Sequence, residues 1–123
     1  MTIHESAEDY LESILILQER RGTVRSIDIV NELGYSKPSV SIAMKKLREN
    51  GYISMSPDGL ITLNESGLEI ARRIYHRHRT LTQLFAMLGV SPENASADAC
   101  KVEHDLSEET FARIHDFVKR QGT

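Results

Sequence analysis

Apolar residues recur at helical spacing in the segment Ala7–Arg21. Tyr10, Ile14 and Leu17 stand at positions i, i+4 and i+7, which places them on one face of an amphipathic helix. Gly22 follows, and glycine favours the backbone conformation that ends helices. The pattern therefore predicts that the chain begins with one helix of about four turns.

Two shorter helices are predicted next. The segment Ser26–Leu33 has inward-facing apolar residues at helical spacing, and Ser26 is a suitable N-cap. After a tight connection, Ser36 is placed to cap a third helix. Pro38 falls in the first turn of that helix, where the missing N–H costs nothing. We expect the third helix to run to about Asn50.

The period of the pattern then changes from helical to extended. Tyr52–Ser56 and Leu60–Leu63 are short runs rich in β-forming residues. Between them stands Pro57-Asp58-Gly59, a turn sequence that favours a β-hairpin. Helix, helix, tight turn, helix and hairpin follow in the order of a winged helix-turn-helix domain.

The second half of the chain is predicted to be helical. A long helix is expected over Asn64–Leu88, with Asn64 as its cap, and its apolar seam has the 3-4-3-4-3 spacing of heptads. The seam consists of Ala71, Ile74, His78, Leu81, Phe85 and Leu88. Another helix opens at Ser91-Pro92, breaks near Ala95–Ser96 and resumes to about His104, and the last helix spans Ser107 to about Lys119.

These elements predict a mainly α fold with a small β-hairpin. Residues 1–63 would form the N-terminal winged helix-turn-helix DNA-binding domain. Residues 64–123 would provide the linking helix and a C-terminal helical domain for dimerisation, because the heptad-like seam suits packing against a partner helix.

Composition narrows the class of protein. The 123 residues are 40% hydrophobic and 27% charged, which is an ordinary globular balance. No stretch approaches the roughly 18 apolar residues of a membrane span, and the N-terminus lacks a signal pattern. One cysteine forms no internal disulfide, so we expect a cytoplasmic protein without a membrane partner. The net charge of −3, taken alone, disfavours a nucleic-acid partner.

The charge of the third helix changes that picture. Between residues 35 and 50 there are four basic residues and one acidic residue, a local charge of +3. A recognition helix carries small or polar residues at its N-terminal end and phosphate-binding cations along its flank. The predicted DNA contacts are Arg25, Ser26, Ser36, Lys37, Pro38, Ser39, Ser41, Lys45 and Lys46. The alternative is that these cations form only a solvated helix surface. The predicted wing, Ser54–Gly59, contains no Lys or Arg, so any contact of the wing with DNA is expected to be modest.

Three predicted helices carry groups that bind metals. Asp9 and Glu12 share a face of the first helix. His78 stands on the seam of the long helix, and the run Cys100, Glu103 and His104 stands at i, i+3 and i+4. Mixed oxygen, nitrogen and sulfur donors suit a divalent first-row transition metal. Taken singly, the same residues also fit a polar helix face, a hydrogen-bonded histidine and a small buried thiol.

Three motifs together resemble the diphtheria toxin repressor family of metal-dependent transcriptional regulators, and most of all its manganese transport regulators. These motifs are Glu8–Glu12, His76–Arg79 and Asp98–His104 followed by Leu106-Ser107. The resemblance covers nearly the whole chain. It implies a homodimeric repressor that binds a double-stranded DNA operator when loaded with one or two Mn²⁺ or Fe²⁺ ions per subunit.

The resemblance also implies a ligand set. The residues that match the metal ligands of the manganese branch are Asp9, Glu12, His78, Glu103 and His104, with Glu12 and Glu103 able to serve two ions. Cys100 departs from this pattern, because the manganese branch usually has Glu there and the iron branch has Cys. The iron branch in turn has Met in place of Asp9, so this chain combines features of both branches.

We therefore expect a metal-dependent repressor of manganese or iron homeostasis genes, which is not an enzyme. The first alternative is a winged-helix transcription factor that works without metal. A metalloenzyme is the second alternative, and the sequence argues against it because it has no nucleophile elbow, Gly-rich phosphate loop or His-Glu-x-x-His motif. The remaining histidines, His4, His76 and His115, are expected to be surface groups.

Overall fold

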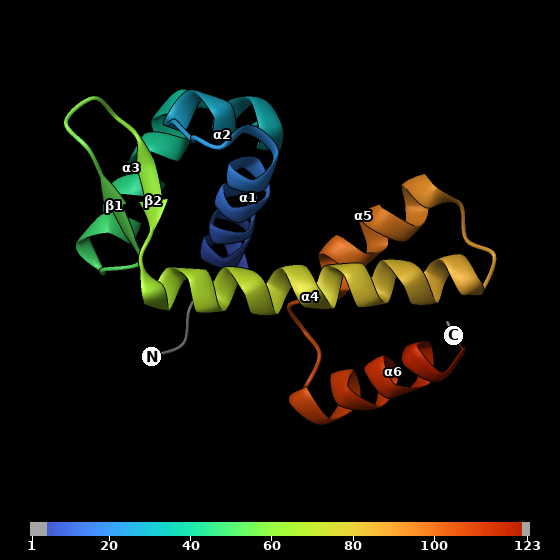
Figure 1. Cartoon of the computed structure of the whole chain (residues 1–123). Helices are drawn as coiled ribbons and strands as arrows, with labels where there is room; N and C mark the ends of the chain where they lie inside the picture. The colour runs from blue at the N-terminus through green and yellow to red at the C-terminus, as the bar shows by residue number, and fades with distance from the viewer. Residues whose placement is uncertain (1–4, 122–123) are drawn as a thin grey trace. The chain divides into compact units, whose positions relative to one another are not determined.

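The computed structural model describes residues 5–121, which form helices and one small β-hairpin (Figure 1). The elements are α1 (Glu5–Arg21), α2 (Ser26–Leu33), α3 (Lys37–Glu49), β1 (Ile53–Met55), β2 (Ile61–Leu63), α4 (Glu65–Met87), α5 (Pro92–Val102) and α6 (Glu108–Gln121). The predicted fold class is confirmed. The chain divides into two compact units between Arg72 and Arg73, within α4. We call these unit 1 and unit 2.

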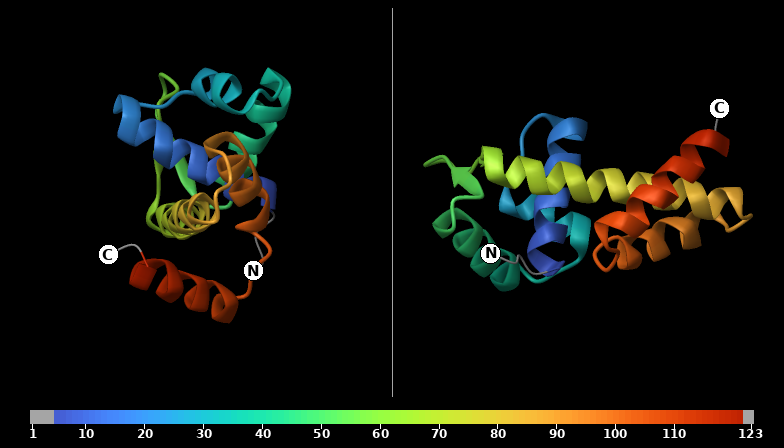
Figure 2. Two further views of the ribbon diagram at one scale, coloured as in Figure 1. Left: turned by 90° about the vertical axis from the view of Figure 1, so that its right-hand side faces the viewer. Right: turned by 90° about the horizontal axis from the view of Figure 1, so that it is seen from below.

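Unit 1 is built around α1, which contacts α2, α3 and β2 (Figure 2). The apolar faces predicted for the first three helices are buried. The buried apolar residues of unit 1 include Leu11, Ile14, Leu17, Val24, Ile29, Val40, Met44, Leu47, Ile53 and Ile61. This core presents the opposite side of α3 to solvent.

The hairpin follows α3 and packs against it through β1. Its strands are antiparallel, with Ile53 opposite Leu63 and Met55 opposite Ile61. The Ile61 N–H donates to the carbonyl oxygen of Val24 at 2.8 Å, which ties the hairpin to the segment before α2. The predicted wing is therefore an integral part of unit 1.

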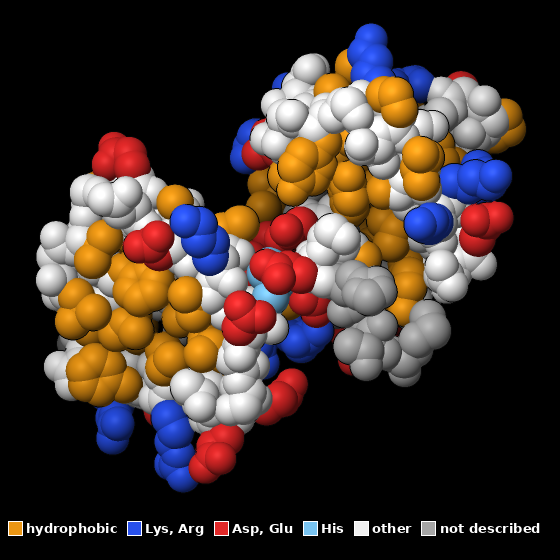
Figure 3. All heavy atoms as spheres, turned by 180° about the vertical axis from the view of Figure 1, so that it is seen from behind, with side chains coloured by type: hydrophobic (Ala, Val, Ile, Leu, Met, Phe, Trp, Pro, Cys, Tyr) orange, Lys and Arg blue, Asp and Glu red, His pale blue; other side chains and the backbone are white. Residues whose placement is uncertain are grey.

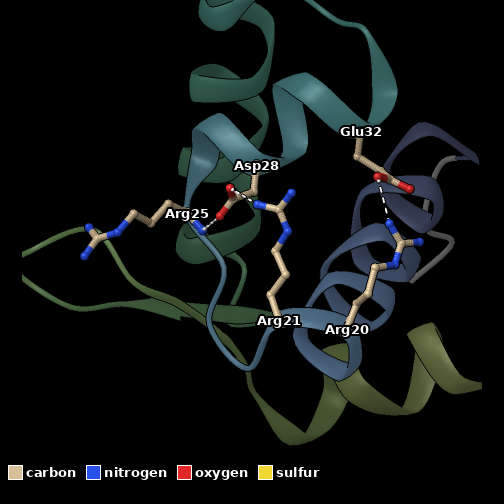
Figure 4. A network of polar contacts seen from close by, with 5 residues as sticks. All are labelled: Arg20, Arg21, Arg25, Asp28 and Glu32. Atoms are coloured by element: carbon tan, nitrogen blue, oxygen red, sulfur yellow. Dashed lines mark hydrogen bonds and ion pairs between the residues drawn. The ribbon is translucent and has the colours of Figure 1, made fainter.

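The start of α2 differs from the prediction that Ser26 is its N-cap. The N-cap is Arg25, and the Asp28 carboxylate accepts a hydrogen bond from the Arg25 backbone N–H at 2.9 Å. Asp28 also pairs with Arg21 at 2.9 Å, while Arg20 pairs with Glu32 at 3.4 Å (Figure 4). The acidic side chain in the first turn thus satisfies the helix end in place of a serine hydroxyl.

The Asn64 side chain lies beside the hairpin at the start of α4. Its amide nitrogen donates to the Gly51 carbonyl oxygen at 3.0 Å, and its amide oxygen accepts from the Ser54 hydroxyl at 2.7 Å. Gly67 in the first turns of α4 has no room for a side chain, because a Cβ there would collide with the carbonyl oxygen of Tyr52. The close approach of α4 to the end of α3 and the hairpin therefore depends on this glycine.

Unit 2 contains the later part of α4 together with α5 and α6. The predicted break near Ala95–Ser96 is wrong, because α5 is continuous and ends at Val102 rather than at His104. Ser91 caps α5, and the alanines of this segment are strong helix formers, so one exposed Ser96 does not interrupt it. Among the described residues, no helix combines the length and the apolar character that a bilayer crossing requires.

Candidate functional site

The exposed face of α3 carries most of the predicted DNA contacts. The Ser36 hydroxyl caps the helix by accepting a hydrogen bond from the Ser39 N–H at 3.2 Å. The exposed residues are Ser36, Lys37, Pro38, Ser39, Ser41, Lys45 and Lys46. Val40, Met44 and Leu47 bury the opposite face. Small polar groups therefore stand at the positive end of the helix dipole, with cations along its flank.

Arg25 connects the start of α2 to the turn of the hairpin. Its guanidinium donates a hydrogen bond to the carbonyl oxygen of Asp58. A hydrogen bond from the Ser56 hydroxyl, at 2.6 Å, lowers the pKa of the Asp58 carboxyl. Arg25 thus places a positive charge at a turn that contains no Lys or Arg. The sequence did not predict this contact, because 33 residues separate Arg25 from Asp58.

Unit 2 brings three predicted metal ligands together. Glu103 is completely buried, and its Oε2 lies 2.9 Å from Nδ1 of His78. Nε2 of His104 lies 3.6 Å from Oε1 of the same carboxylate. Two imidazoles from α4 and from the turn after α5 therefore flank one buried carboxylate.

Arg77 holds the backbone of that turn. Its buried guanidinium donates to the carbonyl oxygen of Glu103 at 3.2 Å and to that of Leu106 at 2.8 Å. The same group lies 5.1 Å from the ring centroid of Phe111 on α6, within cation–π range. Sequence reasoning assigned Arg77 only to a family motif. Its role follows from contacts over 26 and 29 residues, which no local pattern reports.

Cys100 stands on α5 one turn before Glu103. The Glu103 N–H still donates to the carbonyl oxygen of Ala99 at 3.0 Å, so helical geometry continues to Glu103 although α5 formally ends at Val102. Cys100 and Glu103 consequently lie on the same side of the helix, as the i, i+3 spacing predicted. The thiol belongs to an exposed residue, whereas the carboxylate is buried.

Asp9 and Glu12 belong to α1 in unit 1. They share one face at i, i+3 spacing. Glu12 is only 7% exposed, and Glu8, one turn before it, is equally buried, while Asp9 is half-buried. This burial argues against the alternative that these carboxylates only form a solvated polar face of the helix. Acidic side chains are rarely buried unless another group compensates their charge.

Two of the histidines expected at the surface contact each other. The ring centroids of His76 and His115 lie 4.9 Å apart, and Phe111 packs edge-on against His76 at 5.6 Å. Burial, His115 and the nearby Arg79 lower the pKa of His76. This cluster was not predicted, because its members come from α4 and α6. His4 lies outside the described residues.

The donor groups fit a divalent transition metal. Among the described residues, Oε1 of Glu103 is buried without a hydrogen-bond partner. An ionised carboxylate oxygen in that position is costly unless a cation compensates it. Carboxylate oxygen and imidazole nitrogen are suitable ligands for Mn²⁺, Fe²⁺ and their neighbours in the first row.

Unit 2 also exposes apolar surface. Met87, Leu88 and Phe117 are large apolar residues that remain exposed. On the face shown in Figure 3, apolar side chains gather over this unit, on the left of the view. Exposed apolar area of this kind is typical of an interface between subunits.

Two family models match the chain. Residues 2–60 match the iron dependent repressor N-terminal DNA binding domain, and residues 64–122 match the iron dependent repressor metal binding and dimerisation domain. An uncharacterised HTH-type transcriptional regulator of Methanocaldococcus jannaschii is 36% identical over 118 residues, covering 94% of each chain. The transcriptional regulator MntR of Salmonella typhimurium is 35% identical over 119 residues, covering 97% of this chain and 76% of its own.

A solved structure of similar fold is that of a manganese-dependent transcriptional repressor in complex with manganese. It superposes with a TM-score of 0.84 at 30% sequence identity and covers 92% of this chain. The match covers 52% of that chain, so the present chain spans about half the length of this solved relative.

Arg77 provides a test of the geometry of unit 2. Replacing Arg77 by Met leaves the carbonyl oxygens of Glu103 and Leu106 without this donor, and we expect the free energy of unfolding to fall by about 2–4 kcal/mol. The measurement is urea unfolding of the metal-free protein. Arg79→Met, which changes an exposed arginine two residues away, should cost less than about 1 kcal/mol. Equal losses in the two variants would contradict the role given to Arg77.

Proposed function

The chain belongs to the family of iron-dependent repressors, and on this basis we propose a function for each of its two domains. Members of this family are metal-dependent, DNA-binding transcriptional regulators and not enzymes. The family resemblance predicted from the three motifs is confirmed. The proposed N-terminal domain, residues 1–63, reads an operator. The proposed C-terminal domain, residues 64–123, binds metal and pairs two subunits into a homodimer.

The observation that carries the metal proposal is the buried carboxylate of Glu103, held by His78 and flanked by His104. We propose that these residues bind the ion together with Cys100 and with two carboxylates from the DNA-binding domain. These two are Asp9 and Glu12. One or two Mn²⁺ or Fe²⁺ ions per subunit would supply the positive charge that such a set of carboxylates lacks.

The ligand set would couple metal binding to DNA binding because it draws on both domains. Without metal, the carboxylates repel one another and α1 is held less firmly. With metal, conformers whose two recognition helices match half-sites about one helical turn apart are selected. A coupling free energy of about 2–3 kcal/mol is sufficient for such a switch.

The identity of the metal turns on two residues. Cys100 offers a thiolate, which favours Fe²⁺ over Mn²⁺, whereas the hard carboxylate of Asp9 shifts the preference back toward Mn²⁺. Cys100 also stands where a carboxylate would be able to bridge two ions. We propose that Cys100 is the residue that separates this chain from a pure manganese regulator.

We further propose that the protein acts in the cytoplasm, where its operator lies, and that it catalyses no reaction. The alternative is a winged-helix transcription factor that binds DNA without metal. In that case the cluster around Glu103 would only stabilise unit 2, and removing the metal would leave operator affinity unchanged.

Metal dependence is tested by fluorescence anisotropy on operator duplexes selected from a random library. We expect chelation to weaken binding by about 30- to 150-fold, the fold-change that corresponds to the coupling free energy above. Glu103→Gln and His104→Gln should remove this difference, whereas Glu109→Gln, on the exposed face of α6, should retain it. Equal affinity of the wild-type protein with and without metal would overturn the switch.

Metal identity is tested by anaerobic titration of operator binding with Fe²⁺ and Mn²⁺. We expect Cys100→Glu to shift the preference toward Mn²⁺, because a carboxylate replaces a softer thiolate. The number of ions bound per subunit, measured by elemental analysis, should not fall in this variant. An unchanged Fe²⁺-to-Mn²⁺ ratio of activation would remove Cys100 from the ligand set.

The face of α3 is tested by the salt dependence of operator binding. Each phosphate contact contributes about 0.9 to the slope of log K against log salt concentration. Because the dimer carries one Lys45 in each subunit, we expect Lys45→Ala to remove two phosphate contacts and to reduce the slope by about two. Lys101→Ala removes an exposed lysine from α5 and should leave the slope unchanged. Identical slopes for Lys45→Ala and the wild-type protein would exclude a phosphate contact at Lys45.

A further inference from the structure

One large apolar side chain interrupts the polar face of α3. Among the described residues of unit 1, Ile42 is 58% exposed, and the other exposed large apolar residues, Ile27 and Tyr35, are 42% exposed each. A single exposed apolar residue is common on protein surfaces and by itself indicates nothing. The position of Ile42 on the helix distinguishes it.

Ile42 lies at the centre of the predicted DNA-binding face. Residues three and four positions apart are neighbours on a helix surface. The neighbours of Ile42 on the N-terminal side are Pro38 and Ser39, and those on the C-terminal side are Lys45 and Lys46. All four are exposed and are predicted to contact DNA. Ile42 is therefore surrounded by the groups that would place α3 in the major groove.

A shallow hollow of about 240 Å³ adjoins Ile42. Its apolar lining includes Met44 and Met55, and its cationic lining comes from Lys45 and Arg48. The Arg48 guanidinium lies 3.9 Å from the sulfur of Met55, so α3 and β1 are in contact at the hollow. At this surface, apolar side chains therefore lie next to cationic side chains that are able to bind phosphate.

An isoleucine has no hydrogen-bond donor or acceptor and cannot read the polar edge of a base. The apolar group that base pairs present in the major groove is the 5-methyl group of thymine. Given the proposed function, on which this inference rests, we propose that Ile42 selects thymine in each half-site of the operator by apolar contact with that methyl group. The cations beside it would bind phosphates and carry no sequence preference.

The test replaces thymine by deoxyuridine, which removes only the 5-methyl group and keeps every hydrogen bond. Operators are first selected from a random duplex library with the metal-loaded protein, and each thymine is then substituted in turn. At one symmetric pair of positions we expect affinity to fall about fourfold for one substitution and about fifteenfold for both, the loss associated with one and two buried methyl groups.

Two variants assign this loss to its residue. Ile42→Ala should bind the thymine and deoxyuridine operators with equal affinity. Ile27→Ala removes the same atoms from an exposed isoleucine on α2 and should retain the wild-type loss. Because both residues are exposed, both variants should fold, which far-ultraviolet circular dichroism checks.

The outcomes separate this inference from the proposed function. If the metal-loaded protein binds no selected duplex, the proposed function is wrong and the inference fails with it. If the protein binds but deoxyuridine has no effect at any position, only the inference is overturned. The inference is likewise overturned, and the proposed function is not, if Ile42→Ala shows the full wild-type loss at the sensitive position.

Discussion

A carboxylate that is fully removed from water is the constraint on which unit 2 depends. Glu103 satisfies one oxygen through His78 and leaves the other without a hydrogen bond among the described residues. Isolated buried charge is expensive unless hydrogen bonds or a nearby positive charge compensate it. The hydrogen bond with His78, the buried guanidinium of Arg77 on the Glu103 carbonyl oxygen and, in the proposed site, a divalent ion each contribute to this compensation.

Unit 1 has a different requirement in the proposed function. The chain as a whole is acidic, yet one surface of unit 1 must present cations to DNA. Helix α3 buries Val40, Met44 and Leu47 and so has a single orientation on the core. The side that faces away carries small hydroxyls at the N-terminal end and lysines along the flank. In the proposed function, the local charge of this helix face, and not the net charge of −3, would meet the phosphates of DNA.

Much of the fold was predictable because it is encoded locally. The apolar period of Ala7–Arg21, the cap at Ser36 and the turn at Pro57-Asp58-Gly59 each act within a few residues. The errors were also local. A serine was expected to cap α2 although Asp28 satisfies the same N–H from three residues further on, and the exposed Ser96 was expected to break a helix that is continuous. Both errors arose because serine is favoured at caps and turns, a weak local preference that the Asp28 contact outweighs in α2 and the flanking alanines outweigh in α5.

In the candidate site, contacts within one helix were predictable from the sequence, whereas contacts between distant segments were not. The sequence by itself determined the chemical types of the proposed metal ligands, the helical spacing of Cys100 and Glu103, and the cationic face of α3. Spacing within one helix converts directly into a shared face. Only the tertiary structure decided that His78 meets Glu103, that Arg77 holds the turn after α5, and that Arg25 reaches the hairpin. These partners lie 25 or more residues apart, and chain packing alone determines which of them meet.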